Sequence, residues 1–327
     1  MPLNDFGQAE LAAYQPEVTV PQDFDAFWQR TLAEARSHGG AVKAERVTDQ
    51  YGLRTVEVDD VRLPGWNGEP VAAWLLRPRG AKGPLPVIVT CLGYSSGRGL
   101  PTEHLFWPSV GYAQLVVDTR GQGHDTPDPW TGTGTQWSGG FMTRGIQSPE
   151  EYYYRRVISD CVRAVDAVAE LPGLDTGRVV VAGSSQGGGL SLAVAALAGD
   201  KLSGVMADVP FMCHYRKAVQ LASDSPYVEL VHYLRWHSRH KVDETFATLD
   251  YFDGVHFAQR ATVPALFGVA LMDPTCPALT VYAAFNNYAG EDRTMTVWPV
   301  ADHSSGCGSV QPDQLAWLTR SGLVPAS

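Results

Sequence analysis

The sequence has few cysteines, no long apolar segment and no typical export signal, and each absence excludes a class of protein. No Cys-x-x-Cys pair occurs, and the cysteines are odd in number and scattered: Cys91, Cys161, Cys213, Cys276 and Cys307. This usage predicts free thiols rather than a disulfide framework or a zinc finger. No stretch approaches the roughly 18 apolar residues that a membrane span needs. The first residues lack a basic region followed by an apolar core, so we predict no signal peptide and a cytoplasmic protein.

Positive charge is also scarce. The chain has 25 Lys and Arg against 35 Asp and Glu, which gives a formal charge of −10. A balance this acidic argues against nucleic acid or an anionic membrane as a partner. The 327 residues include 44% apolar residues, which is enough for a large core. We therefore predict a globular protein whose partners are small molecules.

Short, nearly continuous apolar runs dominate the chain after residue 80. Such runs are typical of strands buried on both faces of a mostly parallel sheet. They cover residues 85–94, 112–123, 178–188, 202–210, 263–273 and 293–303. Helical patterns separate most of them, most clearly at residues 151–171 and 312–322. The alternation predicts a doubly wound α/β fold.

The parts outside this alternation lie at the amino terminus and between two of the predicted strands. Residues 1–80 predict an extension with a helix over residues 23–38 and antiparallel strands around a Trp-Asn-Gly turn. Residues 211–260 interrupt the rhythm, and we predict a cap-like insertion over the carboxyl edge of the sheet. The five histidines of this insertion match no HExxH pattern, so we predict no metal site there. The whole chain, residues 1–327, is predicted to be one domain.

A Gly-x-Ser-x-Gly pattern, Gly183–Gly187, stands between a predicted strand and a predicted helix. Small residues on both sides of Ser185 allow a turn sharp enough to expose its hydroxyl at a helix amino terminus. The alternatives are a glycine-rich turn capped by serine, or a phosphate loop. A phosphate loop requires a lysine before the Ser or Thr, and none is present. The context therefore favours Ser185 as a nucleophile.

A serine nucleophile needs a base and an acid, and in this type of fold they follow it in the order Asp, His. Asp273 and His303 each come just after a predicted strand, which brings them to the same sheet edge as Ser185. His303 would accept the Ser185 proton, and Asp273 would fix the imidazole. The alternative for Asp273 is a helix cap. Asp302, beside the base, is interpreted as a loop carboxylate.

A tetrahedral intermediate needs two hydrogen-bond donors for its oxyanion. The backbone N–H of Gln186 follows the nucleophile directly, and the N–H of Tyr94 lies in the loop after an early strand. We predict these two donors. A packed loop tyrosine is the alternative for Tyr94.

Three tryptophans, Trp107, Trp130 and Trp137, lie in segments predicted near the mouth of the site. They are candidates for stacking on sugar rings, with core packing as the more frequent alternative for any one of them.

Several long segments carry a resemblance that covers nearly the whole chain. They include GYSSGRG, DTRGQG, GFMTRGI, YYYRRVISDCVRAVDAV, GSSQGGGLSLAVAAL and LDYFDGVHFAQRATVPALFGVALMDPTCP. On these motifs the chain resembles the cephalosporin C deacetylases and acetyl xylan esterases, carbohydrate esterase family seven, of the α/β-hydrolase superfamily.

The resemblance implies hydrolysis of short acyl esters, chiefly acetate, from carbohydrates and from cephalosporin-type molecules, without a cofactor or metal. It assigns the nucleophile, acid and base to Ser185, Asp273 and His303, and the oxyanion donors to Tyr94 and Gln186. The family's RGQ motif falls on Arg120, Gly121 and Gln122, as supports of the elbow. Members commonly form ring-shaped homohexamers, so a homohexamer is expected here.

Two departures from the family pattern bear on the site. The base is usually followed by glutamate, whereas His303 precedes Ser304. Thr275 replaces a bulky aliphatic residue and Pro274 a polar one, in a segment that helps to line the family's acyl pocket. With Tyr94 and Pro210, Thr275 is predicted to line this pocket, and a smaller, more polar lining predicts a softened preference for acetate.

Two alternatives remain beside the acetylated-sugar esterase. One keeps the Ser–His–Asp arrangement but acts on another short-chain ester, a thioester or an amide. The other is a catalytically impaired binding protein, which the missing glutamate makes conceivable.

Overall fold

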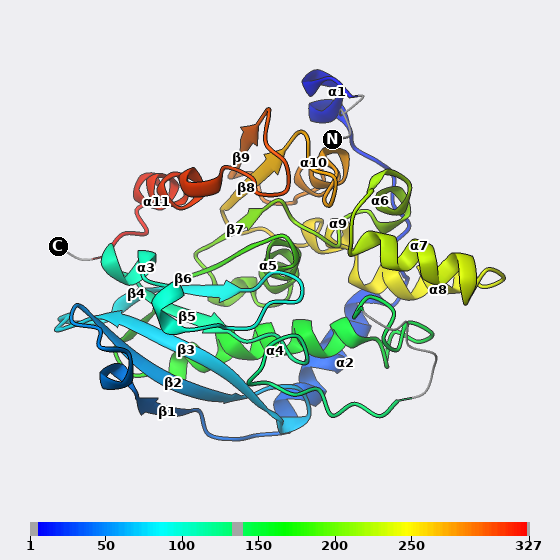
Figure 1. Ribbon diagram of the computed structural model, residues 1–327. Coiled ribbons are helices and arrows are strands. Elements are labelled where there is room, and N and C mark those ends of the chain that lie inside the picture. Colours follow the sequence, from blue (N-terminus) through cyan, green and yellow to red (C-terminus); the bar gives the residue numbers. More distant parts are fainter. Residues whose placement is uncertain (1–5, 133–139, 326–327) are drawn as a thin grey trace.

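A computed structural model describes residues 6–132 and 140–325 of the chain (Figure 1). Its centre is one mixed sheet with the strand order β1-β2-β3-β5-β4-β6-β7-β8-β9. The strands are β1 (Lys43–Arg46), β2 (Val56–Pro64), β3 (Pro70–Pro78), β4 (Leu85–Cys91), β5 (Ala113–Val117), β6 (Leu174–Ser184), β7 (Gly204–Asp208), β8 (Ala265–Ala270) and β9 (Arg293–Trp298). The predicted fold class, a mostly parallel α/β sheet with leading antiparallel strands, is confirmed.

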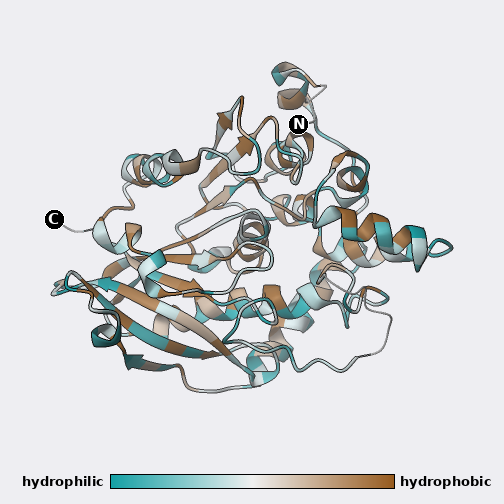
Figure 2. Cartoon of the chain, in the orientation of Figure 1, coloured by the Kyte–Doolittle hydropathy of each residue, from teal (hydrophilic) through white to brown (hydrophobic). Residues whose placement is uncertain are grey.

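The six apolar runs became the parallel strands of the sheet. Strands β5, β4, β6, β7, β8 and β9 pair in parallel, whereas β1, β2 and β3 pair antiparallel and join the sheet through β3 and β5. Strands β5, β7 and β8 are buried throughout. Strand β9 is only half buried because it forms the edge of the sheet, where the sequence predicted burial on both faces. The hydropathy colouring shows apolar residues along β8 and alternation along β2 and β3 (Figure 2).

Helices of different length connect the strands and cover the sheet. They are α1 (Gln8–Ala13), α2 (Phe24–Ser37), α3 (Phe106–Ser109), α4 (Tyr153–Ala167), α5 (Gln186–Leu197), α6 (Tyr215–Leu221), α7 (Tyr227–Trp236), α8 (Val242–Leu249), α9 (Gly254–Ala258), α10 (Ala278–Asn286) and α11 (Val310–Arg320). The predicted amino-terminal helix corresponds to α2, and the two clear later helices correspond to α4 and α11. No helix among the described residues is long and apolar enough to cross a membrane.

Two separate clusters of buried side chains lie on the two faces of the sheet. The larger one includes Phe24 and Trp28 of α2, Ile158 of α4 and Leu190 of α5. The smaller one joins Trp107 of α3 and Trp317 and Leu318 of α11 to strand residues. Helices therefore protect both faces, as a buried parallel sheet requires.

Two of the three candidate tryptophans fall within the described residues. Trp107 is only 3% exposed and packs in the smaller core cluster, so the alternative of core packing is confirmed for it and it is no longer a candidate for stacking on a sugar. Trp130 is half buried, and the guanidinium groups of Arg144 and Arg156 lie 5.3 and 4.9 Å from its ring centre. Trp137 lies outside the described residues.

The five cysteines are free, as predicted; four are buried and Cys307 is exposed.

The segment from residue 211 to residue 260, between β7 and β8, contains α6, α7, α8 and α9. Helix α9 packs against α5 beside the sheet, and α7 reaches the loop after β4 through a contact described below.

Candidate active site

A strained turn joins β6 to α5 and presents Ser185. This serine has φ 57° and ψ −120°, a backbone conformation that residues other than glycine rarely adopt. Its neighbours explain the glycines of the motif. A Cβ on Gly183 would lie 2.4 Å from the Gly187 backbone, and one on Gly187 would lie 2.2 Å from the Cys91 carbonyl oxygen. Strand, turn and helix approach too closely for larger residues, and Ser185 is left half exposed.

The structure brings Ser185, His303 and Asp273 into one hydrogen-bonded chain. Ser185 Oγ lies 2.9 Å from His303 Nε2, and His303 Nδ1 lies 2.8 Å from Asp273 Oδ2. A carboxylate only accepts, so Nδ1 carries the proton and Nε2 accepts from the serine hydroxyl. The His303 side chain is 31% exposed and that of Asp273 is fully buried. This arrangement can move the serine proton toward solvent-accessible imidazole.

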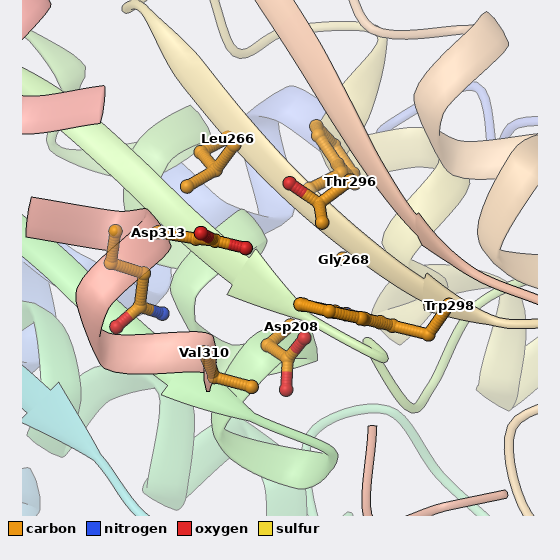
Figure 3. A pocket seen from close by; sticks show the side chains of 9 residues that line it. Asp208, Leu266, Gly268, Thr296, Trp298, Val310 and Asp313 are labelled. Carbon is orange, nitrogen blue, oxygen red and sulfur yellow. The ribbon is translucent and has the colours of Figure 1, made fainter. Parts of the chain in front are cut away.

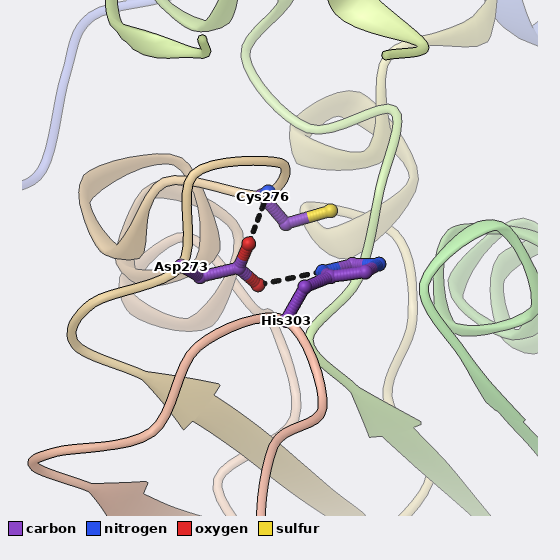
Figure 4. Close-up of side chains that lie close together, drawn as sticks. All are labelled: Asp273, Cys276 and His303. Carbon is purple, nitrogen blue, oxygen red and sulfur yellow. Dashed lines mark hydrogen bonds and ion pairs between the residues drawn. The ribbon is translucent and has the colours of Figure 1, made fainter. Parts of the chain in front are cut away.

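Asp273 follows β8 and is held from behind by backbone donors. The N–H groups of Thr275 and Cys276 each donate to its Oδ1 at 2.8 Å. Its other oxygen is therefore left for His303, and its orientation is fixed before the histidine contacts it (Figure 4). The alternative for Asp273, a helix cap, is not realised: the N-cap of α10 is Pro277, and Asp273 bonds to N–H groups of the turn before that helix.

The thiol of Cys276 also lies in this site. Donor atoms of Asp273, Cys276 and His303 lie within 4.8 Å of one another, which is the kind of cluster that can hold a soft metal ion. The hydrogen bonds of Asp273 to His303 and to two backbone N–H groups already account for its position. Burial raises the pKa of the Cys276 thiol well above its ordinary value, so the thiol is neutral unless a bound cation displaces its proton.

Two backbone N–H groups near Ser185 have no acceptor among the described residues. Gln186 is the first residue of α5, where an N–H has no intrahelical partner and the helix favours negative charge. The N–H of Tyr94, in the loop after β4, likewise donates to no described group. These are the two donors that the sequence predicted for an oxyanion.

The side chains of Gln122 and Gln186 connect the loop after β4 to the turn at Ser185. Gln122 Oε1 accepts from the Ser95 N–H at 2.7 Å, and Gln122 Nε2 donates to Gln186 Oε1 at 2.8 Å. Gln186 Nε2 donates in turn to the carbonyl oxygens of Leu92 and Gly93, each at 3.2 Å. One amide pair therefore fixes the relative position of both candidate oxyanion donors.

The Tyr94 side chain is held from the inserted segment. Its hydroxyl donates to the Glu229 carboxylate of α7, with both oxygens 2.9 Å away, and accepts from the Phe141 N–H at 2.6 Å. Burial and the nearby carboxylate raise the pKa of Tyr94. Burial also raises the pKa of Glu229. Sequence reasoning missed Glu229 because nothing in α7 signals a partner 135 residues away.

The other residues of the predicted RGQ support have different roles. Arg120 is fully buried and forms a bidentate pair with Asp160 at 2.7 and 3.0 Å, and it also bonds Glu69. Gly121 has φ 70°, and a Cβ there would lie 3.0 Å from Asp128. Both residues shape the loop after β5 and so present Gln122.

Of the residues predicted for an acyl pocket, Tyr94 is half buried, and Pro210 and Thr275 are buried. Thr275 is 8% exposed, and its N–H donates to the carboxylate of Asp273.

Ser304, which replaces the expected glutamate, donates from its N–H and its hydroxyl to Asp302 Oδ1 at 2.9 and 2.6 Å.

Comparison of the chain with known proteins finds similar esterases. The family model described as acetyl xylan esterase (AXE1) matches residues 1–321. The acetyl xylan esterase from Paenibacillus sp. R4 is 35% identical with a TM-score of 0.91, covering 96% of this chain and 99% of that one. Acetyl xylan esterase 1 from Thermoanaerobacterium sp. JW/SL YS485 is 30% identical with a TM-score of 0.87, covering 98% and 99%. Acetyl esterase Axe7A of Xylanibacter ruminicola is 27% identical over 314 residues, which are 94% of this chain and 68% of that protein.

Proposed function

Because the chain belongs to the acetyl xylan esterase family of carboxylic ester hydrolases, we propose that it removes acetyl groups from carbohydrates through Ser185, His303 and Asp273. The observation that carries the proposal is the continuous contact from Ser185 Oγ to His303 Nε2, at 2.9 Å, and from His303 Nδ1 to Asp273 Oδ2, at 2.8 Å. Nucleophile, base and orienting acid are within hydrogen-bond reach without rearrangement.

The reaction proceeds by two acyl transfers. His303 accepts the Ser185 proton while Ser185 Oγ bonds to the ester carbon, and the carbonyl oxygen becomes an oxyanion. The N–H groups of Tyr94 and Gln186 bind that oxyanion. Collapse breaks the bond to the sugar oxygen, which takes the proton from His303 and leaves as the alcohol. Water then attacks the acyl-enzyme by the same route and releases acetate and Ser185.

Asp273 stabilises the imidazolium that forms in both transfers. Its two backbone donors hold the carboxylate in place, so no reorganisation is needed when the charge develops. Gln122 keeps the two oxyanion donors at a fixed separation.

The acyl group is proposed to lie against Tyr94, Pro210 and Thr275. Thr275 is small and polar, so a slightly larger acyl group than acetyl fits with little loss. One methylene changes discrimination in an apolar pocket by about 1–3 kcal/mol. We therefore expect a graded preference for acetate.

We further propose that residues 211–260 act as a cap and that the protein assembles as a homohexamer. The cap is supported by the bond from Glu229 of α7 to Tyr94, which ties the inserted segment to the site. The hexamer rests on the family resemblance, and light scattering of the purified chain tests it: a mass near that of a monomer would reject it.

Acetate release from a substrate panel tests the substrate class. The panel contains acetylated xylo-oligosaccharides, cephalosporin C, a short acyl thioester and an acetylated peptide, each run with the Ser185→Ala variant. We expect release from the acetylated sugars and from cephalosporin C, with Ser185→Ala losing at least about three orders of magnitude. Turnover of the thioester alone would replace the substrate assignment, and no turnover of any substrate would favour a binding protein.

A further inference from the structure

A second carboxylate lies under the site, on a strand that the proposed mechanism does not use. Asp208 ends β7 and is 5% exposed. Its Oδ1 accepts from Ser305 Oγ at 2.8 Å, and its Oδ2 accepts from Ser184 Oγ at 3.2 Å. Ser184 precedes the nucleophile, and Ser305 follows His303 by two residues. One side chain therefore holds the nucleophile turn and the histidine loop together.

The position of this carboxylate is costly, which argues that it is not mere packing. Burial raises the pKa of Asp208, against the two hydroxyl donors that lower it. The neighbouring strand makes room with a glycine, because a Cβ on Gly268 would lie 2.0 Å from Asp208 Oδ1. Figure 3 shows Asp208 beside Trp298 at the edge of a small cavity. A buried carboxylate destabilises a fold unless its oxygens are hydrogen-bonded.

The two segments that Asp208 holds are both strained. Ser185 has φ 57° and Ser305 has φ 56°, and neither is a glycine. Such conformations persist only where the surroundings enforce them. Asp208 also accepts the Ser185 N–H through its own carbonyl oxygen, at 2.9 Å. It thus bonds to the nucleophile turn from both backbone and side chain.

The other contacts of the histidine loop are weaker anchors. Asp302 is exposed, and it bonds only within the loop: its side chain accepts from Ser304 and its carbonyl oxygen from the Ser305 N–H at 3.0 Å. Trp298 packs on Gly306, where a Cβ would lie 2.3 Å from its ring, and its carbonyl oxygen accepts a long bond from the Ala301 N–H at 3.4 Å, but its indole N–H bonds to no described residue. A backbone bond from the Met272 N–H to the Ala301 carbonyl oxygen, at 3.0 Å, ties the start of the loop to the segment after β8. Ser305 is 4% exposed, so its bond to Asp208 is a buried side-chain anchor directly beside His303.

We propose that Asp208 is a positioning residue for His303, which it holds toward Ser185 through the hydroxyl of Ser305, and that its negative charge favours the imidazolium. The inference rests on the proposed function of the same site. Other titratable groups also face this region. They are Asp273 and Cys276 before α10, Asp302 in the histidine loop and Asp313 of α11 beside the cavity.

Two variants separate position from charge. Asp208→Asn removes the charge and one acceptor, while Ser305→Gly removes the tether, keeps the charge and suits the positive φ. In both variants we expect kcat on p-nitrophenyl acetate to fall by about tenfold or more, with KM little changed, because small displacements of catalytic groups are costly. In Asp208→Asn the acid limb of the pH profile of kcat/KM moves to lower pH, because an imidazolium next to fewer negative charges loses its proton more readily. In Ser305→Gly that limb moves less.

Thermal unfolding and a matched control complete the experiment. Ser305→Gly is expected to melt close to the wild-type temperature, because glycine relieves the positive φ while Asp208 Oδ1 loses one donor. It should nevertheless lose kcat, a split that a merely structural role does not produce. Ser203→Ala removes a hydroxyl bonded to the Gly177 carbonyl oxygen at the opposite end of β7, and we expect wild-type kcat.

Turnover within about twofold of wild type for Ser305→Gly would overturn the inference, whether or not Asp208→Asn folds. An unmoved acid limb in folded Asp208→Asn would overturn the charge effect. If Ser185→Ala is inactive in the same assay, the proposed function survives either result. An active Ser185→Ala would instead reject the proposed function itself.

Discussion

Gln122 offers a sharp test of how the two oxyanion donors are held. In the wild-type chain its Oε1 accepts from the Ser95 N–H at 2.7 Å and its Nε2 donates to Gln186 Oε1 at 2.8 Å. Gln122→Ala removes both bonds, together with a longer contact from Gln186 Nε2 at 3.2 Å. Each is worth about 1 kcal/mol, so the two together amount to about 2 kcal/mol. If this energy positions the donors in the transition state, kcat falls by about 30-fold.

The assay is steady-state hydrolysis of p-nitrophenyl acetate, with kcat and KM determined separately. KM is expected to change little, because the oxyanion contacts form only in the transition state. Gln122→Glu retains the acceptor for Ser95 and can still accept from Gln186 Nε2, which lies 3.2 Å away in the wild type. It loses one donor and should therefore lose only about fivefold in kcat.

A second glutamine provides the control for this prediction. Gln259→Ala removes an amide contact to Asn287 at 3.4 Å, between the end of α9 and the end of α10, and should leave kcat unchanged. If Gln122→Ala turns over acetate esters within about twofold of wild type, Gln122 does not position the oxyanion donors and the reasoning is refuted.

Three further predictions concern stability, metal sensitivity and acyl specificity. Burial alone would raise the pKa of Asp166, but its bonds from Arg36 and Lys201 outweigh burial and lower it. That stabilisation is present above the unfolded-state pKa and disappears as pH falls through the lower folded-state pKa. Asp166→Asn should therefore lower the melting temperature at neutral pH, and the difference from wild type should vanish in strong acid; an equal difference at every pH would contradict this. Cd²⁺ should inhibit ester hydrolysis by binding to Asp273, Cys276 and His303, and Cys276→Ser should weaken this inhibition about tenfold. Identical inhibition of wild type and Cys276→Ser would exclude this binding site. p-Nitrophenyl acetate, propionate and butyrate should be turned over with a gradual decline, and Thr275→Val should steepen it; a steep drop beyond acetate in the wild type would reject the softened preference.

The parallel strands could be predicted because burial on both faces leaves a strong signal. Runs such as residues 178–188 are apolar without alternation, and only a strand between two layers of helices accommodates them. The serine turn was predictable for the same reason that it is strained: Gly183 and Gly187 leave no room for a Cβ. The order of Ser185, Asp273 and His303 then followed from the strand ends on which they lie.

The supports of the site could not be predicted from the chain. Glu229 reaches Tyr94 across 135 residues, and Asp208 reaches Ser305 across 97. These contacts depend on how segments that are distant in the sequence pack together above the sheet. Neither the type of a residue nor its spacing in the sequence indicates which distant residue it will contact. Asp208 was interpreted only as the end of an apolar run, and Trp107 as a candidate at the mouth, because burial of a single side chain is not visible in sequence.

Labelling with a fluorophosphonate tests the central claim most directly. The probe forms a covalent bond only with a serine whose proton is taken up by a base, here Ser185 with His303. We predict that peptide mass spectrometry finds the phosphonyl adduct on Ser185 of the wild-type chain and that His303→Ala abolishes it. Full labelling at another serine, or undiminished labelling of Ser185 in His303→Ala, would contradict the account.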